Sequence, residues 1–319
     1  MESKNNWKGW LYLAPVLILL SVFTFFPIIN TFYVSFLKDY NYMTGKFSGV
    51  TLDNYLSVLT PFGSLGGGPG SMFEQVMKTA LPNTLVLTII TVPCSIILSL
   101  VIAICLNSIK PLKKFFQTVF FMPYVTNAIA IGMVFSIIFS SYDGGIVNTI
   151  LRTPGMTWIT PNPDAGAAGV VPYGRALFAI CFYIIWHSLP YKILIFLGGL
   201  QNIDKQYYEA AQIDSTGKIK TAWKITIPLL SPQILYMLIT SFIGAFKEYN
   251  SVIGLFGSDG GNFDINTGPA SMQTMVFFIY DQVAKNKVQY ASAASIFLFI
   301  IIMIFTVIQS KVSKKRVHY

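Results

Sequence analysis

The chain has 319 residues, of which 54% are hydrophobic and only 11% are charged. Soluble globular domains contain roughly a quarter of charged residues, so this composition excludes an ordinary soluble domain. The net charge of +9 comes largely from Lys and Arg that flank apolar stretches, which indicates membrane topology and lipid surroundings rather than a nucleic-acid partner. The three cysteines lie inside apolar stretches without metal-ligand spacing, so we expect no metal site and no disulfide framework.

Six apolar stretches are long enough to cross a hydrocarbon core of about 30 Å. They cover residues 11–36, 83–107, 116–140, 176–200, 229–250 and 289–310. We therefore predict an all-α, polytopic protein of the cell (inner or plasma) membrane, with about six transmembrane helices in a single transmembrane domain over residues 1–319.

The distribution of Lys and Arg predicts the orientation of these helices. Six spans place both termini on one side, where thirteen Lys and Arg lie, against eight on the other side. Because basic residues accumulate in cytoplasmic segments, we expect both termini to be cytoplasmic. The segments 37–79, 141–174 and 251–287 then become external loops, with a short helix around residues 270–283 in the last of them.

Residues 204–228 form a polar, helix-prone stretch between the fourth and fifth apolar runs. Asp204 is suited to cap a helix that ends at Ile213. Tyr207, Ala210, Ala211 and Asp214 would share one face of it. Ser215–Gly217 would break this helix, with Gly217 free to adopt positive φ. A second short helix would follow from Lys218 to Thr226, capped by Ser215 or Thr216.

The same stretch resembles the EAA loop of ATP-binding-cassette (ABC) importer permeases. The matching residues are Glu209-Ala210-Ala211, Asp214 and Ile225-Thr226-Ile227-Pro228, at the spacing of that family. The chain departs from the family at the turn, where Asp-Gly-Ala is replaced by Asp214-Ser215-Thr216-Gly217. Elsewhere the chain is similar to the MalF/UgpA-type carbohydrate permeases at Leu13-Ala14-Pro15, Met122-Pro123, Leu189-Pro190 and Ala245-Phe246-Lys247.

The resemblance implies a type I ABC importer permease with a MetI/MalF-like fold. It implies four kinds of partner or cofactor: a second permease of MalG/UgpE type, two ATPase subunits, an extracellular solute-binding protein, and ATP with Mg on the ATPases. The sequence contains no P-loop, so we expect no cofactor in this chain and no catalytic residue: a transport subunit rather than an enzyme. Residues 204–228 would couple to the ATPase, with Glu209 as the charged contact, Ala210, Ala211 and Gly217 for close fit, and Asp214 holding the bend.

Polar residues inside membrane spans are costly and are candidates for a substrate path. Those of this chain are Asn127, Trp186, His187, Lys192, Lys247, Glu248 and Asn250. Each also has a structural interpretation, such as a hydrogen bond between helices for His187 or a span end for Lys247 and Glu248. If Lys192 and Lys247 both face the cavity, an acidic sugar becomes a candidate substrate.

Three functions remain open at this point. The first is import of sugars or oligosaccharides by alternating access, including acidic ones. The second is import of another solute, such as glycerol phosphate or a polyamine, which the EAA loop alone does not exclude. The third is an ion-coupled secondary carrier, which we disfavour because the Asp and Glu residues lie in loops or at span ends.

Overall fold

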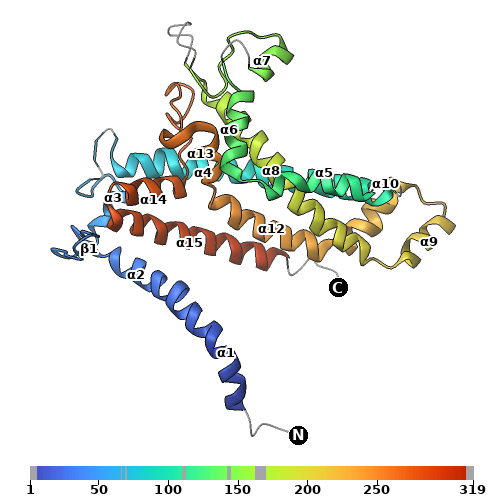
Figure 1. The fold of residues 1–319 in the computed structure, drawn as a ribbon, viewed down its shortest axis with the longest axis horizontal. Coiled ribbons are helices and arrows are strands. Elements are labelled where there is room, and N and C mark those ends of the chain that lie inside the picture. The colour runs from blue at the N-terminus through green and yellow to red at the C-terminus, as the bar shows by residue number, and fades with distance from the viewer. Residues whose placement is uncertain are drawn as a thin grey trace. The chain divides into compact units, whose positions relative to one another are not determined.

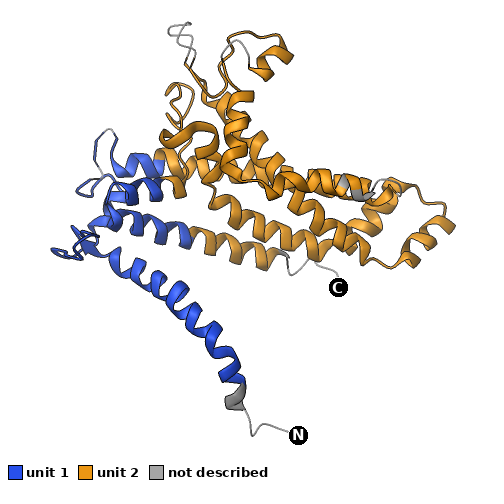
Figure 2. Cartoon of the chain, viewed as in Figure 1, with its two compact units in different colours: residues 1–77, 278–300 blue, residues 78–277, 301–319 orange. Residues whose placement is uncertain are grey.

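The computed structural model describes residues 6–65, 67–68, 70–109, 113–141, 145–161 and 170–313, and helices dominate it (Figure 1). The chain forms two compact units, one of residues 1–77 with 278–300 and the other of residues 78–277 with 301–319 (Figure 2). We describe each unit by itself. The termini, predicted to be cytoplasmic, include residues 1–5 and 314–319, which lie outside the described residues.

The first unit begins with an apolar helix that is almost entirely exposed within the chain, with Val34 at its end buried. It consists of α1 (Asn6–Leu20), a π-helical turn (Ser21–Phe25) and α2 (Phe26–Val34). The stretch from Gly9 to Val34 is 26 residues long, with a mean hydropathy of 2.3. A helix that is apolar all round and unburied in its own chain is suited to lipid or to another membrane subunit.

The segment predicted as the first external loop has a structure of its own. Strand β1 (Leu37–Lys38) pairs antiparallel with β2 (Gly49–Val50), and α3 (Asp53–Leu59) follows. The buried Asn54 amide donates to the carbonyls of Ser35 and Leu37, both at 2.9 Å, and so fixes the hairpin to α3. Hydrogen bonds between Ser64 and Asp53 order the polypeptide beyond α3.

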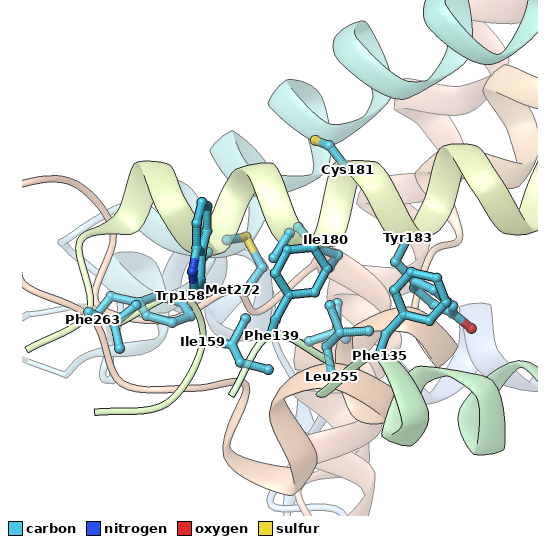
Figure 3. Close-up of a cluster of buried hydrophobic side chains, with 14 of the residues drawn as sticks. Phe135, Phe139, Trp158, Ile159, Ile180, Cys181, Tyr183, Leu255, Phe263 and Met272 are labelled. Carbon is cyan, nitrogen blue, oxygen red and sulfur yellow. The ribbon is translucent and has the colours of Figure 1, made fainter. Parts of the chain in front are cut away.

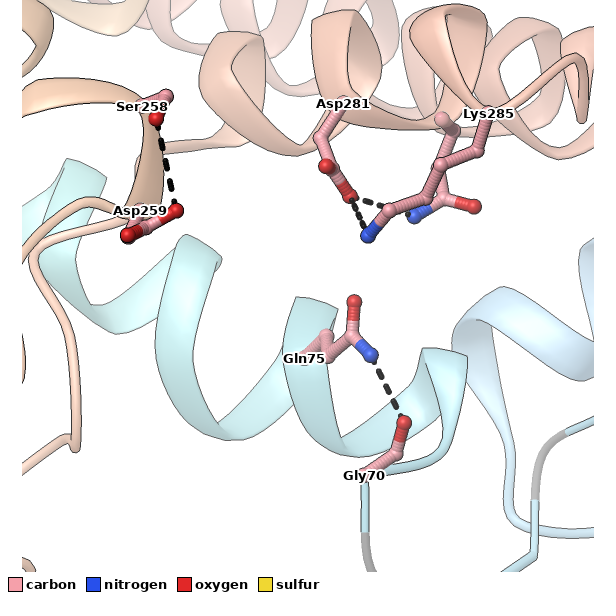
Figure 4. A network of polar contacts seen from close by, with 7 residues as sticks. Gly70, Gln75, Ser258, Asp259, Asp281 and Lys285 are labelled. Atoms are coloured by element: carbon pink, nitrogen blue, oxygen red, sulfur yellow. Dashed lines mark hydrogen bonds and ion pairs between the residues drawn. The ribbon is translucent and has the colours of Figure 1, made fainter.

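Ser64 holds the glycine-rich part of this loop against α3. Its hydroxyl and its amide both donate to the Asp53 carboxylate, and these bonds lower the pKa of Asp53 below its usual value. Figure 4 shows two further polar contacts of the unit. Gln75 donates to the Gly70 carbonyl at 2.7 Å, and Lys285 pairs with Asp281 at 2.7 Å. Hydrogen bonds therefore order much of the described part of this predicted external loop.

The second unit is built on α4 (Leu81–Ser108), which packs against α8 (Tyr173–Gln201) and α12 (Ser231–Phe246). A ladder of buried hydroxyl side chains runs along α4: Thr84, Thr88, Thr91, Ser95 and Ser99. Each hydroxyl donates to a carbonyl three or four residues earlier in its own helix. Small side chains whose donors are satisfied in this way let neighbouring helices approach closely.

The remaining elements complete both units. They are a π-helical turn (Glu74–Ala80), α5 (Lys113–Val125), α6 (Ala128–Ile138), α7 (Ile146–Leu151), α9 (Lys205–Ile213), α10 (Lys218–Thr221), a π-helical turn (Ala222–Thr226), α11 (Ile227–Leu229), α13 (Asn250–Phe256), a 3₁₀ turn (Gly257–Asp259), α14 (Met275–Ala284) and α15 (Val288–Ser313). Helix α14 is the short helix expected around residues 270–283.

One predicted span, residues 116–140, is broken rather than continuous, and the fifth predicted span, 229–250, is largely covered by α12, which begins just after a second bend. Residues 116–140 divide into α5 and α6, whose axes differ by 102°, and the helix of residues 218–229 meets α12 at 68°. The first break is stabilised by Asn127, whose side chain accepts from the amides of Ile129 at 2.9 Å and Ala130 at 3.2 Å and so caps α6. Among the described residues, four helices can span a membrane alone, and up to six spans result if each bent pair is one.

Helix α6 is held in place by an aromatic core in the second unit (Figure 3). The Phe135 ring lies 5.0 Å from that of Tyr183, and the Phe139 ring lies 5.8 Å from that of Trp158. Gly132 of α6 meets Gly254 of α13 so closely that a Cβ on it would lie 2.7 Å from the Gly254 Cα. The bend of this span is therefore fixed by packing on both sides of α6.

Two buried asparagines pin the predicted external loops to the helices. Asn83, at the start of α4, donates to the carbonyls of Ser271 at 2.8 Å and Gln273 at 2.9 Å, and accepts from the Tyr173 hydroxyl at 2.8 Å. Asn148 of α7 accepts from the Trp158 indole at 2.8 Å. Buried amides whose hydrogen bonds are made specify a unique loop conformation.

Candidate functional site

The EAA element, residues 204–228, begins with a helix whose start is set by its cap. The Asp204 carboxylate accepts from the Gln206 amide at 3.0 Å, and α9 runs from Lys205 to Ile213. Both the predicted cap and the predicted end are confirmed. The cap satisfies one of the amides that the first turn of a helix leaves without a backbone partner.

The turn after α9 differs from the prediction. Ser215, rather than Gly217, adopts positive φ, at 52°, while Gly217 has φ of −65°. The Thr216 amide donates to the Ala211 carbonyl at 2.9 Å and the Ser215 amide to the Gln212 carbonyl at 3.0 Å. These two bonds form a Schellman motif, which requires a left-handed residue directly after the helix cap.

The second helix of the element also differs from the prediction. The start of α10 at Lys218 has Gly217 as its cap residue, without a side-chain cap, instead of Ser215 or Thr216. It is followed by the π-helical turn Ala222–Thr226 and by α11, where one helix from Lys218 to Thr226 was expected. An N-cap residue has an extended backbone, which Gly217 adopts with φ of −65° and ψ of 150°, whereas Ser215 is in the left-handed region.

Helix α9 with its following turn and the segment of residues 220–225 line a groove of about 480 Å³. Its lining combines small or apolar residues with both acidic and basic ones: Asp204, Gln206, Tyr207, Ala210, Ala211, Asp214, Thr216, Lys220, Thr221, Lys224 and Ile225. The predicted face of α9 therefore does line a groove. Of the predicted coupling residues, Ala210, Ala211 and Asp214 line it, whereas Glu209 is exposed beside it and Gly217 lies in the turn.

Large apolar side chains stand exposed on this otherwise polar element. They are Tyr207, Ile213, Ile219 and Trp223, with Ile213 84% and Trp223 68% exposed. Ile219 and Trp223 are four residues apart, a spacing that brings side chains together on a helix face. Clustered exposed apolar side chains mark interaction surfaces. Of these, the sequence analysis placed only Tyr207 on an interaction face and did not single out Ile213, Ile219 and Trp223, because isolated apolar residues in a polar segment give no periodic pattern.

A second site lies among the membrane-spanning helices. Residues of α4, α5, α8 and α12 surround a cavity of about 300 Å³, which we call the α8 pocket. Its lining is Thr91, Val92, Ser95, Tyr124, Ile184, His187, Ser188, Tyr191, Lys192, Thr240, Ser241, Gly244, Ala245 and Glu248. Convergent polar groups and aromatic rings in one concave site are typical of small-molecule binding.

Lys192 is the most buried ionisable side chain of the α8 pocket, at 7% exposure. Its Nζ donates to the hydroxyl of Ser95 on α4 and, at 3.3 Å, to that of Ser188 on its own helix. His187 Nε2 is buried and makes no hydrogen bond with any described residue. Glu248 is already engaged, since its carboxylate accepts from the Ser251 amide at 3.0 Å.

Three tyrosines from three helices meet at the α8 pocket. The rings of Tyr124 on α5 and Tyr191 on α8 are stacked, with centroids 5.6 Å apart and planes 16° apart. The Tyr191 hydroxyl lies 3.3 Å from that of Tyr236 on α12. Neither Tyr124 nor Tyr191 was a candidate from sequence, because each ring is placed by tertiary packing.

The other sequence candidates lie outside the lining of this pocket. Asn127 caps α6, and the Trp186 ring packs 5.1 Å from that of Phe135. Lys247 and Asn250 are exposed. His187, Lys192 and Glu248 are the candidates that the structure brings together. Among the described residues, no group of three His, Cys, Asp or Glu side chains is placed to hold a metal ion.

Comparison with known proteins identifies the class to which this fold and these sites belong. Residues 95–319 match the family model "Binding-protein-dependent transport system inner membrane component". The chain therefore belongs to this family of membrane permeases, and the predicted resemblance and helical membrane fold are confirmed.

Individual relatives agree with the family assignment. The chain is 31% identical to the arabinooligosaccharides transport system permease protein AraP of Bacillus subtilis, over 95% of this chain and 88% of AraP. It is 30% identical to the multiple sugar-binding transport system permease protein MsmF of Streptococcus mutans, over 98% and 97%. A bacterial alginate ABC transporter, solved in complex with an alginate pentasaccharide-bound periplasmic protein, contains a chain of the same fold, with a TM-score of 0.74, 18% identity and coverage of 98% and 96%.

Proposed function

We propose that this chain is the permease subunit of an ATP-driven, solute-binding-protein-dependent importer of sugars or oligosaccharides. The observation that carries the proposal is the pairing of two sites in one permease fold. The EAA element offers a groove to an energy-supplying partner, and the α8 pocket offers aromatic rings and hydroxyl groups to a solute. The chain moves its solute by alternating access between the two sides of the membrane.

The EAA element is the docking site for an ATPase subunit. An interface core of this kind requires apolar anchors and small residues that permit close approach, with polar groups at its edge. Trp223 and Ile219 supply the anchors, and Ala211 supplies the close approach. Glu209, exposed beside the groove, makes a charge-assisted hydrogen bond to a basic residue of the ATPase.

The complete importer requires several partners. A second permease of related sequence completes the pathway, two ATPase subunits bind ATP and Mg, and an external binding protein delivers the solute. The family description and the binding protein in the structural relative support this assembly. The EAA element and both termini face the cytoplasm, in agreement with the bias in Lys and Arg.

The proposed substrate class follows from the α8 pocket and from the relatives. Stacked tyrosine rings present apolar faces that pack against the C–H faces of a sugar ring. Hydroxyl groups of Ser188, Thr240 and Ser241 lie in the same lining and can exchange hydrogen bonds with sugar hydroxyls. The names of AraP and MsmF refer to arabinooligosaccharides and multiple sugars.

Reconstitution of the importer tests this proposal. The chain is inserted into proteoliposomes with its partner permease, ATPases and binding protein, and sugar uptake is measured together with ATP hydrolysis. Ala211→Trp fills the groove and should abolish sugar-dependent ATP hydrolysis, and Glu209→Ala should weaken it without affecting membrane insertion. Gln212→Ala, an exposed neighbour outside the groove lining, is the matched control. Normal uptake in both Ala211→Trp and Glu209→Ala would reject coupling through the EAA element.

A further inference from the structure

The α8 pocket holds a buried cation, Lys192, that forms no ion pair with any described residue. Lys192 is 93% buried within membrane-spanning helices, since 7% of it is exposed. Among the described residues, no carboxylate oxygen lies within 4.0 Å of its Nζ. Glu248 lines the same pocket, but its carboxylate lies beyond 4.0 Å from Nζ of Lys192 and is held by the Ser251 amide at the start of α13. An ammonium group without a counter-ion is costly in such surroundings and attracts an anion.

The hydrogen bonds of Lys192 leave one donor for a ligand. An ammonium group has three N–H donors. Ser95 and Ser188 accept two of them, and no other described residue accepts the third. The two serines also hold the flexible side chain in one position, which reduces the entropy that binding would otherwise cost. His187 Nε2, unpaired in the same pocket, offers a second nitrogen to a polar ligand.

We propose that Lys192 determines substrate specificity by binding the carboxylate of a uronic acid unit in the α8 pocket. The tyrosine pair Tyr124 and Tyr191 packs against the sugar ring while Lys192 binds the acid group. This inference rests on the proposed sugar-import function and adds to it the acidic class of substrate. It assigns the role to Lys192 alone, because Lys247 is exposed and does not line the pocket.

A purely structural role for Lys192 has different consequences. If its bonds to Ser95 and Ser188 served only to join α4 to α8, then Lys192→Met would lower stability and weaken the binding of every sugar equally. If its charge serves an acidic ligand, Lys192→Met should fold at least as stably, because replacing a buried charge by an apolar side chain of similar size is often neutral or stabilising. Only the preference for the acidic sugar should then be lost.

Equilibrium binding to the assembled permease and ATPase complex in nanodiscs tests the proposal. The probes are uronate trisaccharides from alginate and from polygalacturonate, each compared with its carboxyl-reduced form, which is neutral but has the same length and linkage. In the wild type, at least one acidic trisaccharide should bind about 10-fold or more tightly than its reduced form, the range expected for a hydrogen bond to a charged group. Lys192→Met should reduce this ratio to about 1, and Lys192→Arg, which keeps the charge, should retain a preference above 1.

Lys247→Met is the control, because it removes an equal charge from an exposed position outside the pocket, and its ratio should equal that of the wild type. A wild type that binds neutral sugars without preferring either acidic form would overturn the role of Lys192 and leave the proposed function intact. So would a preference that persists in Lys192→Met, or a ratio that Lys247→Met lowers equally. A wild type that binds none of the four sugars would also overturn the uronic-acid assignment, whereas the proposed function fails only if the reconstituted importer takes up no sugar at all.

Discussion

The α8 pocket and the EAA element depart from the usual distribution of side chains in opposite ways. The pocket buries polar groups, including Lys192 and His187, among apolar helices. The EAA element exposes large apolar groups, including Ile213 and Trp223, on a polar surface. Each departure costs free energy in the isolated chain, and each is relieved by a bound partner of matching chemistry. A polar solute therefore suits the α8 pocket, and an apolar protein surface suits the EAA element.

The largest effect is expected for loss of an exposed apolar side chain from the EAA element. Trp223→Ala removes the exposed ring, and a buried Trp anchor typically contributes about 2–4 kcal/mol to an interface. The affinity of the ATPase for the permease should therefore fall by about 30-fold or more, as measured by titrating labelled ATPase onto the permease complex. Phe62→Ala is the control, because Phe62 is also exposed but lies in the first unit. Unchanged affinity in Trp223→Ala would show that no partner covers this ring.

A smaller effect is expected in the α8 pocket. Tyr191→Ala removes a ring that stacks on Tyr124 and should weaken sugar binding by about 1 kcal/mol, roughly fivefold. Tyr191→Phe keeps the ring and loses the contact between its hydroxyl and that of Tyr236, so it should change sugar binding less. Isothermal titration of the assembled complex measures both. Equal losses in the two variants would assign the contribution to the hydroxyl rather than to the ring.

A third prediction concerns the turn of the EAA element. Ser215→Gly relieves the left-handed conformation at φ of 52° and should stabilise the end of α9 by about 1 kcal/mol. Hydrogen exchange of the last amides of α9 should then slow by about fivefold. Thr216→Gly is the control, because Thr216 does not have positive φ and the substitution only adds freedom to the unfolded chain. Faster exchange in Ser215→Gly would contradict the strain assigned to Ser215.

The smallest effect is expected for an exposed ion pair that lies outside both the α8 pocket and the EAA element. Lys285→Ala removes the ion pair with Asp281, in which Lys285 is 57% exposed. Exposed pairs four residues apart on a helix contribute about 0.3–0.5 kcal/mol, so thermal unfolding should change little at moderate salt. A large loss of stability would show that Lys285 makes a stabilising contact beyond this solvated ion pair.

The local features of the EAA element could be predicted from sequence because they depend on neighbouring residues. Asp204 caps α9 by bonding two residues ahead, and the shared face of Ala211 and Asp214 follows from helical periodicity. The turn was assigned to the wrong residue because a glycine is the usual left-handed residue. Ser215 takes that conformation instead because it directly follows the helix cap.

The break in the predicted span 116–140 could not be predicted in the same way. A hydropathy window over residues 116–140 has the same value whether the helix continues or bends by 102° at Asn127. The bend depends on contacts with distant residues, such as Gly132 with Gly254. The sequence likewise could not distinguish Lys192 from Lys247, since both lie within predicted spans. Packing of α8 against α4 buries Lys192 beside Ser95, while Lys247 stays exposed.

The sequence by itself determined the membrane class, the approximate spans and the position of the EAA element, because hydrophobicity, periodicity and capping act over short stretches of chain. Only the tertiary structure decided which polar side chains share a pocket, because Ser95, Tyr124 and Lys192 come from three helices that meet through packing. It also decided that the Schellman turn after α9 opens a groove next to exposed apolar side chains. The free energy of close packing depends on which surfaces meet, and that information is distributed over the whole chain.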